Sequence, residues 1–152
     1  MKRLLFVITG IVLFSTVVFA SRSECGMAER QIITIRDWDA LWHSYARYAH
    51  CNDDGEIAES YDDVVSAKLL LEKWDTLPQL AVLVDKNTQF KNFVLKHISL
   101  TALGTDELKK LKIKAVQHCP VAQTELCNDI RNRVEKLEQE NADFQRRFKH
   151  LR

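Results

Sequence analysis

The sequence predicts an all-α protein: a small, disulfide-stapled bundle of about five to six helices with a long C-terminal helix. Three observations lead to this fold class. Only 4 glycines and 2 prolines occur in 152 residues, too few for the many tight turns of an all-β fold. Apolar residues recur three and four positions apart along most of the chain, as on one face of a helix. Four cysteines follow a segment that is typical of an export signal, and disulfides form in exported proteins.

Residues 1–20 have the pattern of a secretory signal peptide. Lys2 and Arg3 form a positive start, and a nearly continuous apolar stretch ends in the small residues Val18 and Ala20. We expect cleavage, with no stable membrane anchor afterwards, because this stretch is at the short end of the range for a membrane span. The cleaved chain would carry 20 basic and 21 acidic side chains, a net charge of −1. Such a balance argues against nucleic-acid binding.

The helical domain is predicted over residues 36–128, after an extended N-terminal arm at residues 21–35 that includes a strand-like run at 31–35. Thr34 and Asp37 stand three apart, as in a capping box, and precede the first helix. That helix has an aromatic face, which we interpret as core. Its apolar positions are Trp38, Leu41, Trp42, Tyr45, Tyr48 and Ala49.

Four further helices follow within this domain. The second begins after an acidic turn at residues 52–55, and the third after Thr76 and Gln79, which form another capping-box pair. Gly104 interrupts the helical pattern and Pro120 ends it, so the fifth helix lies between them. The apolar positions of these helices are Ile57, Tyr61, Val64, Val65, Leu69 and Trp74; Leu77, Leu80, Ala81, Leu83 and Val84; Phe90, Phe93, Val94, His97 and Ile98; and Leu108, Leu111, Ala115 and Cys119.

The C-terminal segment, residues 129–152, is the most regular part of the chain and follows a heptad pattern. Asn141 is at an a position, where a polar residue fixes the register of paired helices. Arg133 and Glu138, at g and the following e, have complementary charges. We expect the first half to pack on its own bundle, while Asn141, Phe144 and Phe148 extend past the domain and bind a protein partner or a second copy. The a and d positions are Cys127, Ile130, Val134, Leu137, Asn141, Phe144, Phe148 and Leu151.

Cys25, Cys51, Cys119 and Cys127 are an even number in an exported chain, which predicts two disulfides. Four cysteines allow three connectivities. We favour sequential pairing, Cys25–Cys51 and Cys119–Cys127, because it closes the shortest loops. The nested alternative joins Cys51 to Cys119 and Cys25 to Cys127.

Metal binding is the alternative use of these cysteines. The doublets His50-Cys51 and His118-Cys119 contain the two histidines and two cysteines of a tetrahedral zinc site. Adjacent residues rarely bind one ion together without strain, and no Cys-x-x-Cys motif is present, so the primary prediction includes no metal and no cofactor.

The order of the segments resembles that of small, cysteine-containing, all-helical periplasmic proteins of bacteria. The likeness covers an export signal, an aromatic helix followed by Cys51, a short Trp74/Leu77/Leu80 segment and Cys119-Pro120 before Cys127. Some of these proteins are immunity proteins that neutralise toxins of type VI secretion systems. The resemblance rests on layout over residues 38–127 and transfers no functional residue.

We therefore predict an exported protein, in the bacterial periplasm, that works by binding another protein as an immunity, inhibitor or adaptor protein. An enzyme is the third hypothesis, after the metal- or ligand-binding protein. The sequence contains no Gly-x-Ser-x-Gly nucleophile motif and no glycine-rich phosphate loop, so we predict no catalytic residue.

Overall fold

The computed structural model describes residues 25–51 and 55–149, and this part of the chain contains helices, turns and loops but no β-strand. The predicted all-α class is confirmed, and the described residues form seven α-helices once the helix at residues 25–32 is included. The predicted signal peptide lies outside the described residues. In chain order the elements after residues 25–32 are α2 (Trp38–Tyr48), η1 (Ala49–Cys51), α3 (Gly55–Asp62), the π-helix η2 (Asp63–Leu71), η3 (Trp74–Thr76), α4 (Leu77–Lys86), α5 (Thr88–Lys96), α6 (Leu100–Gln117), η4 (Val121–Gln123) and α7 (Thr124–Phe148).

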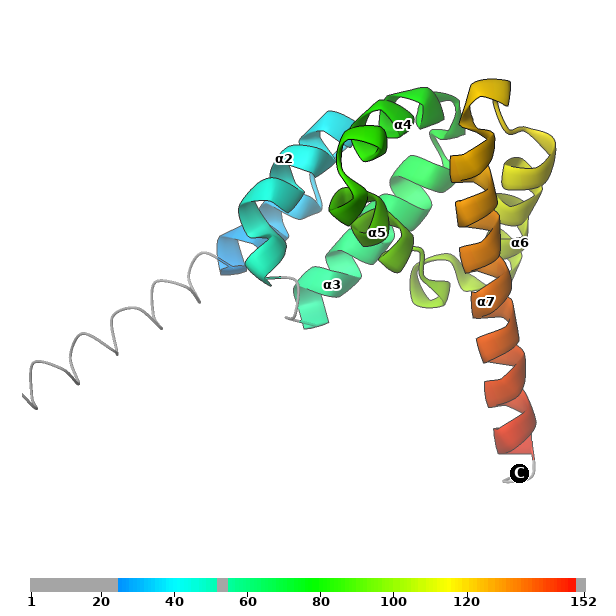
Figure 1. Ribbon diagram of the computed structural model, residues 1–152. Coiled ribbons are helices and arrows are strands. Elements are labelled where there is room, and N and C mark those ends of the chain that lie inside the picture. Colours follow the sequence, from blue (N-terminus) through cyan, green and yellow to red (C-terminus); the bar gives the residue numbers. More distant parts are fainter. Residues whose placement is uncertain (1–24, 52–54, 150–152) are drawn as a thin grey trace, which may run out of the picture.

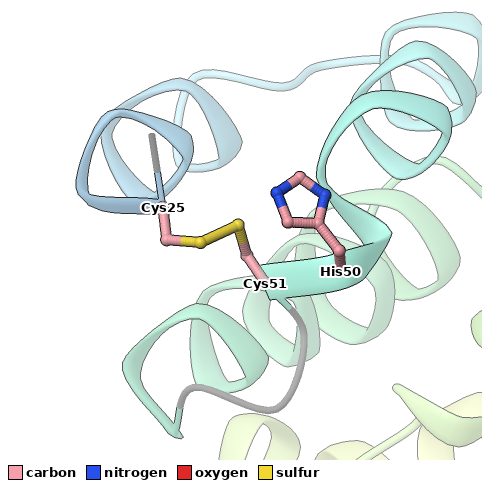
Figure 2. Close-up of side chains that lie close together, drawn as sticks. All are labelled: Cys25, His50 and Cys51. Atoms are coloured by element: carbon pink, nitrogen blue, oxygen red, sulfur yellow. A yellow bond between two sulfur atoms is a disulfide. The ribbon is translucent and has the colours of Figure 1, made fainter. Parts of the chain in front are cut away.

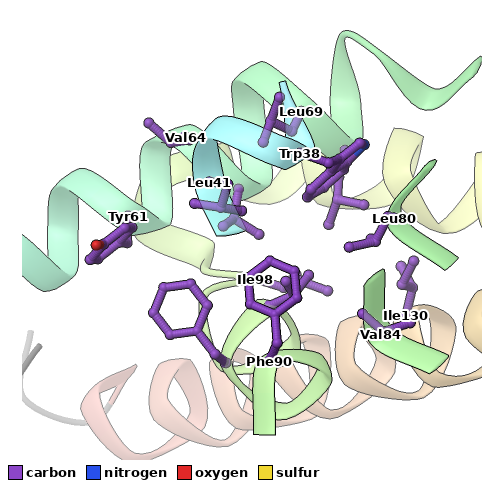
Figure 3. Close-up of a cluster of buried hydrophobic side chains, with 14 of the residues drawn as sticks. Trp38, Leu41, Tyr61, Val64, Leu69, Leu80, Val84, Phe90, Ile98 and Ile130 are labelled. Carbon is purple, nitrogen blue, oxygen red and sulfur yellow. The ribbon is translucent and has the colours of Figure 1, made fainter. Parts of the chain in front are cut away.

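The core is one cluster of buried side chains to which all the α-helices contribute. In Figure 1, α2, α3, α4 and α5 lie on one side of the molecule, while α6 and α7 run side by side on the other. Figure 3 shows Trp38 and Leu41 from α2 facing Phe90 and Ile98 across the interior, with Ile130 of α7 at one edge. The aromatic face of α2 is core, as predicted, because Trp38 and Tyr48 are buried.

Residues 25–32 form a helix, so the prediction of an extended arm over residues 21–35 is wrong for the described part of that range. Ala28 and Ile32 lie four positions apart and are fully buried. The hydroxyl of Tyr48 donates a hydrogen bond of 2.8 Å to Oε1 of Gln31. Burial of one helical face against α2 therefore overrides the β-propensity of the following isoleucines.

Both predicted capping boxes are wrong. Asp37 caps α2 alone, because its Oδ1 accepts a hydrogen bond from the backbone N–H of Ala40 at 2.8 Å, while the Thr34 hydroxyl donates to the backbone of Gln31. Thr76 makes no cap for α4. Its hydroxyl instead accepts a hydrogen bond of 2.8 Å from Nε1 of Trp38, so it connects two helices.

The second predicted helix changes type in the middle. α3 passes directly into the π-helix Asp63–Leu71, and at its end the N–H of Glu72 donates to the carbonyl of Ala67, five residues back. Tyr61, Val65, Leu70 and Trp74 are buried and four to five positions apart. An α-helix would rotate the later ones away from the core, whereas the longer π step keeps them on one side.

α6 contains the break that Gly104 predicts. The backbone of Gly104 has φ 69° and ψ 177°, a combination that residues with a Cβ atom rarely adopt. Ser99 caps the helix before this break, since its side chain accepts a hydrogen bond from the N–H of Thr101. The helix therefore begins earlier than the sequence predicts and turns at Gly104.

Candidate functional site

α7 is buried along its first half and exposed along its second. Its buried residues are confined to the region from Leu126 to Leu137. Asn141 is half-buried, and every described residue after it is exposed. Figure 1 shows the last turns of α7 continuing past the other helices. We call residues 141–149 the projecting segment.

Two aromatic rings form the apolar surface of the projecting segment. Phe144 is 55% exposed and Phe148 is 48% exposed, and their ring centroids are 4.4 Å apart. They continue the stripe that Ile130, Val134 and Leu137 bury inside the domain. Gln145 and Lys149 flank the two rings and line a shallow hollow with them. Exposed neighbouring phenyl rings are unusual on a monomer surface, so this stripe is a candidate contact surface.

Charged side chains are ordered along the end of α7. Glu140 and Asp143 come first, and Arg146, Arg147 and Lys149 follow. Glu140 pairs with Lys136 at 3.9 Å, and Asp143 pairs with Arg146 one turn later. These side chains are at least half exposed, so both pairs are weak and exchange easily with other partners.

The domain fixes α7 up to the start of the projecting segment. The guanidinium of Arg133 donates to the carbonyls of Leu95 and Ile98, both at 3.2 Å. Nζ of Lys112 on α6 lies 2.8 Å from Oε2 of Glu138 and also pairs with Glu135 at 3.4 Å. The Glu138 carboxylate raises the pKa of Lys112 above its ordinary value. Burial of the amine opposes this rise, and the Glu135 carboxylate adds to it. Arg133 and Glu138 are thus engaged within the chain, which the heptad pattern alone does not indicate.

A second ionic contact holds α5 against α7. Nζ of Lys91 lies 2.5 Å from Oδ2 of Asp129 and 3.2 Å from Oε1 of Glu125. The Asp129 carboxylate in this ion pair raises the pKa of Lys91 above its ordinary value. The sequence gives no sign of this contact, because its partners are more than thirty positions apart.

Both disulfides have the sequential connectivity that the sequence predicts. Cys25 bonds to Cys51 and Cys119 bonds to Cys127, with Cα atoms 5.5 and 6.0 Å apart. The first bond ties the helix at residues 25–32 to η1, which directly follows α2. The second encloses the corner at Pro120 and holds the start of α7.

The described residues do not form the four-ligand metal site that was the alternative use of the cysteines. The only group of metal-binding side chains in the described residues is Cys25, His50 and Cys51, whose ligand atoms lie within 4.8 Å of one another (Figure 2). The two sulfur atoms are bonded to each other, so they supply no thiolate to an ion. Cys119 belongs to the other disulfide, and the second doublet does not join this group.

A buried polar cluster that the sequence does not indicate lies beside the π-helix. His97 is 1% exposed, and its Nδ1 lies 2.6 Å from Oδ1 of Asp62. Its Nε2 is enclosed and has no hydrogen-bond partner in the described part of the chain. The nearby hydroxyl of Ser66 bonds to the backbone of His97 and not to the ring. The pair therefore has the orienting carboxylate of a hydrolase but no nucleophile hydrogen-bonded to the histidine.

A surface hollow of about 390 Å³ lies between α2 and the residues that precede it. His43, Ser44 and Arg47 line it, but Ser44 shares a hydrogen bond of 2.9 Å with the hydroxyl of Tyr61. Burial raises the pKa of Tyr61 above its ordinary value. Nothing in this hollow or in the polar cluster positively indicates catalysis.

In the described part of the chain, every helix is too short or too polar to cross a membrane. Comparisons with known protein families, with curated proteins and with solved structures find no match.

Proposed function

We propose that this chain is an exported, non-enzymatic protein-binding module that acts as an immunity, inhibitor or adaptor protein of the bacterial periplasm. The projecting segment is its contact surface, with Phe144 and Phe148 as the anchors. Aromatic anchors in the centre of a contact and polar side chains at its rim are the usual composition of a protein interface.

The observation that carries this proposal is that the heptad stripe of α7 is buried up to Leu137 and exposed beyond the edge of the domain. Val134 and Leu137 are buried and stabilise the fold, whereas about half of the surface of Phe144 and of Phe148 remains exposed. Holding two phenyl rings in water is unfavourable, by about 25 cal/mol for each Å² of apolar surface that could be covered. A partner that covers the rings recovers this free energy.

Capture from a periplasmic extract at natural abundance tests the proposal. We expect the wild-type chain to retain a stoichiometric protein, and a Phe144→Ser/Phe148→Ser variant to lose it. Ile113→Ser/Val116→Ser is the matched control, because these residues are also exposed and apolar, three positions apart on α6. Loss of the partner in both variants, or capture of none by the wild type, contradicts a specific site on α7.

The immunity version of the proposal makes a narrower prediction. We expect a secreted toxin to be encoded beside this gene, and cells that produce the toxin to survive only when they also produce this chain. The Phe144→Ser/Phe148→Ser variant should fail to protect. Survival without the chain would leave only the inhibitor or adaptor versions.

Export is tested separately. N-terminal sequencing of the protein recovered from the periplasm should begin at Ser21, after removal of residues 1–20. The two disulfides are compatible with this compartment. Recovery of the intact chain from the cytoplasm would contradict it.

A further inference from the structure

We infer that the projecting segment pairs with the same segment of a second copy of this chain, and that the two helices run antiparallel. The inference rests on the proposed function, because it takes the projecting segment as the binding surface and names its occupant. To the proposed function it adds that the partner is a second copy, that the two helices run antiparallel, and that salt weakens their association.

The order of charges along α7 supports the antiparallel orientation. The acidic side chains lie on the domain side of both aromatic rings. The basic side chains follow Phe144, toward the end of the chain. In an antiparallel pair centred near Arg146, Asp143 of each copy comes opposite Lys149 of the other, while parallel pairing places each cation opposite the same cation of the second copy. The acidic residues are Glu140 and Asp143, and the basic residues are Arg146, Arg147 and Lys149.

The aromatic rings fit the same arrangement. In an antiparallel pair centred near Arg146, Phe144 of one copy lies opposite Phe148 of the other, and this occurs twice by symmetry. Four rings then share one contact, and the charged side chains lie at its rim. Rings that are half exposed in one copy are covered in the pair, which supplies the apolar part of the association.

A parallel coiled coil is disfavoured by the domain itself. Extending the seam toward the start of α7 would require Val134 and Leu137, and both are buried against the chain's own core. Arg133 and Glu138, the side chains that would pair across a parallel seam, are bound to α5, α6 and the connection between them. Only the projecting segment is available, and its cations would face one another in parallel.

The length of the contact sets its strength. Residues 141–149 extend about 13 Å at 1.5 Å per residue. Such a contact covers less than the roughly 1,200 Å² of a standard stable interface. We therefore expect a dimer that forms at high concentration and dissociates on dilution.

Sedimentation equilibrium of the exported chain, with both disulfides intact, measures this association. We expect dimerisation that weakens as salt is added, because the attraction between the two copies is partly ionic. The Phe144→Ser/Phe148→Ser variant should dimerise at least about tenfold more weakly, and Ile113→Ser/Val116→Ser should dimerise like the wild type. Circular dichroism verifies that each variant is folded, which it should be because all four residues are exposed.

Charge reversal tests the orientation. Arg146→Glu/Arg147→Glu/Lys149→Glu makes the segment wholly acidic, and Glu140→Lys/Asp143→Lys makes it wholly basic, so neither variant should self-associate. The variant with all five changes restores opposite charges in antiparallel pairs and should dimerise again. X-ray scattering of the wild-type dimer should give an elongated particle with the two domains at opposite ends.

Five outcomes overturn the inference. Association that strengthens with salt, or a compact dimer, indicates parallel pairing. A monomer at all concentrations that binds vesicles of anionic phospholipid through Phe144 and Phe148 identifies a lipid surface instead. A monomer that retains a different protein through the same two residues leaves the proposed function standing and removes only the second copy, whereas a dimer insensitive to both phenylalanines contradicts both proposals.

Discussion

Ser66 is a polar residue whose role depends entirely on its burial. It is fully buried in the π-helix, and its hydroxyl donates to the carbonyl of His97 at 2.8 Å and accepts from the N–H of Ser99 at 3.0 Å. One side chain thus satisfies two backbone groups in the connection between α5 and α6. Groups of this kind are costly to leave without a partner inside a protein.

Replacing Ser66 by alanine should lower the free energy of unfolding by roughly 1–3 kcal/mol, because a carbonyl and an N–H lose their buried partner. Urea denaturation followed by circular dichroism measures the change. Thr124→Ala is a suitable control, since its hydroxyl bonds to the carbonyl of Val121 at an exposed site. Equal effects for the two variants would contradict the assigned role of Ser66.

Tyr61 should make stability fall in alkali. Its folded-state pKa is raised above 10.0 by burial, so the unfolded chain loses the phenol proton first. The stability that depends on this proton is fully present below pH 10.0 and is lost as pH rises toward the folded-state pKa.

Tyr61→Phe should therefore flatten the decline of stability above pH 10, while lowering stability at neutral pH by about 1 kcal/mol through loss of the hydrogen bond with Ser44. Denaturation curves of both proteins at a series of pH values measure this. Parallel declines in alkali would show that Tyr61 does not titrate as stated.

The two disulfides act on elements at opposite ends of the domain. Cys25–Cys51 closes a loop with a sequence separation of 26, and Cys119–Cys127 closes one with a separation of 8. A cross-link stabilises a fold mainly by restricting the unfolded chain, and the effect grows with loop length.

Replacing Cys25 and Cys51 by serine should cost about 3.5 kcal/mol, and replacing Cys119 and Cys127 about 2.5 kcal/mol, from the loop lengths. Thermal unfolding of the two double variants compares them directly. A larger loss for the shorter loop would mean that the corner at Pro120 contributes native-state contacts beyond chain entropy.

Several elements could be predicted from the sequence because local spacing determines them. The aromatic face of α2 and the heptad stripe of α7 have uninterrupted helical periodicity, and the shortest-loop rule predicts the disulfides. The π-helix could not be predicted, since Leu69 and Trp74 drift off the face of an α-helix and only the tertiary core shows why. The helix at residues 25–32 was hidden by the isoleucines at 32, 33 and 35, whose β-propensity outweighed a weak helical pattern.

The candidate site could be predicted in part for the same reason. Phe144 and Phe148 follow the periodicity of a core stripe, and the short domain suggests that they extend past it. The contacts of Arg133 and Glu138 are not predictable, because their partners come from distant segments. The metal hypothesis fails because sequence adjacency of histidine and cysteine does not indicate which cysteines bond to each other.

At the scale of the whole molecule, the projecting segment is separable from the fold. A chain that ends at Glu140 should unfold with a free energy within about 0.5 kcal/mol of the full chain, because no described residue beyond Leu137 is buried. Ile130→Ala is the contrasting control, with an expected loss of roughly 2–5 kcal/mol for a fully buried position. Calorimetry distinguishes the two. Marked destabilisation by truncation would place residues 141–149 within the cooperative unit.

Gly104 introduces a question of handedness. It has the single positive φ among the described residues, and its dihedral pair is the mirror image of extended backbone. An L-alanine there is strained, whereas a D-alanine would occupy its own favoured region. In a chemically synthesised chain, the D-alanine form should be the more stable of the two, by about 1 kcal/mol or more in thermal unfolding. At this one place in α6, the fold favours the enantiomer that ribosomes do not supply, and glycine is the nearest substitute.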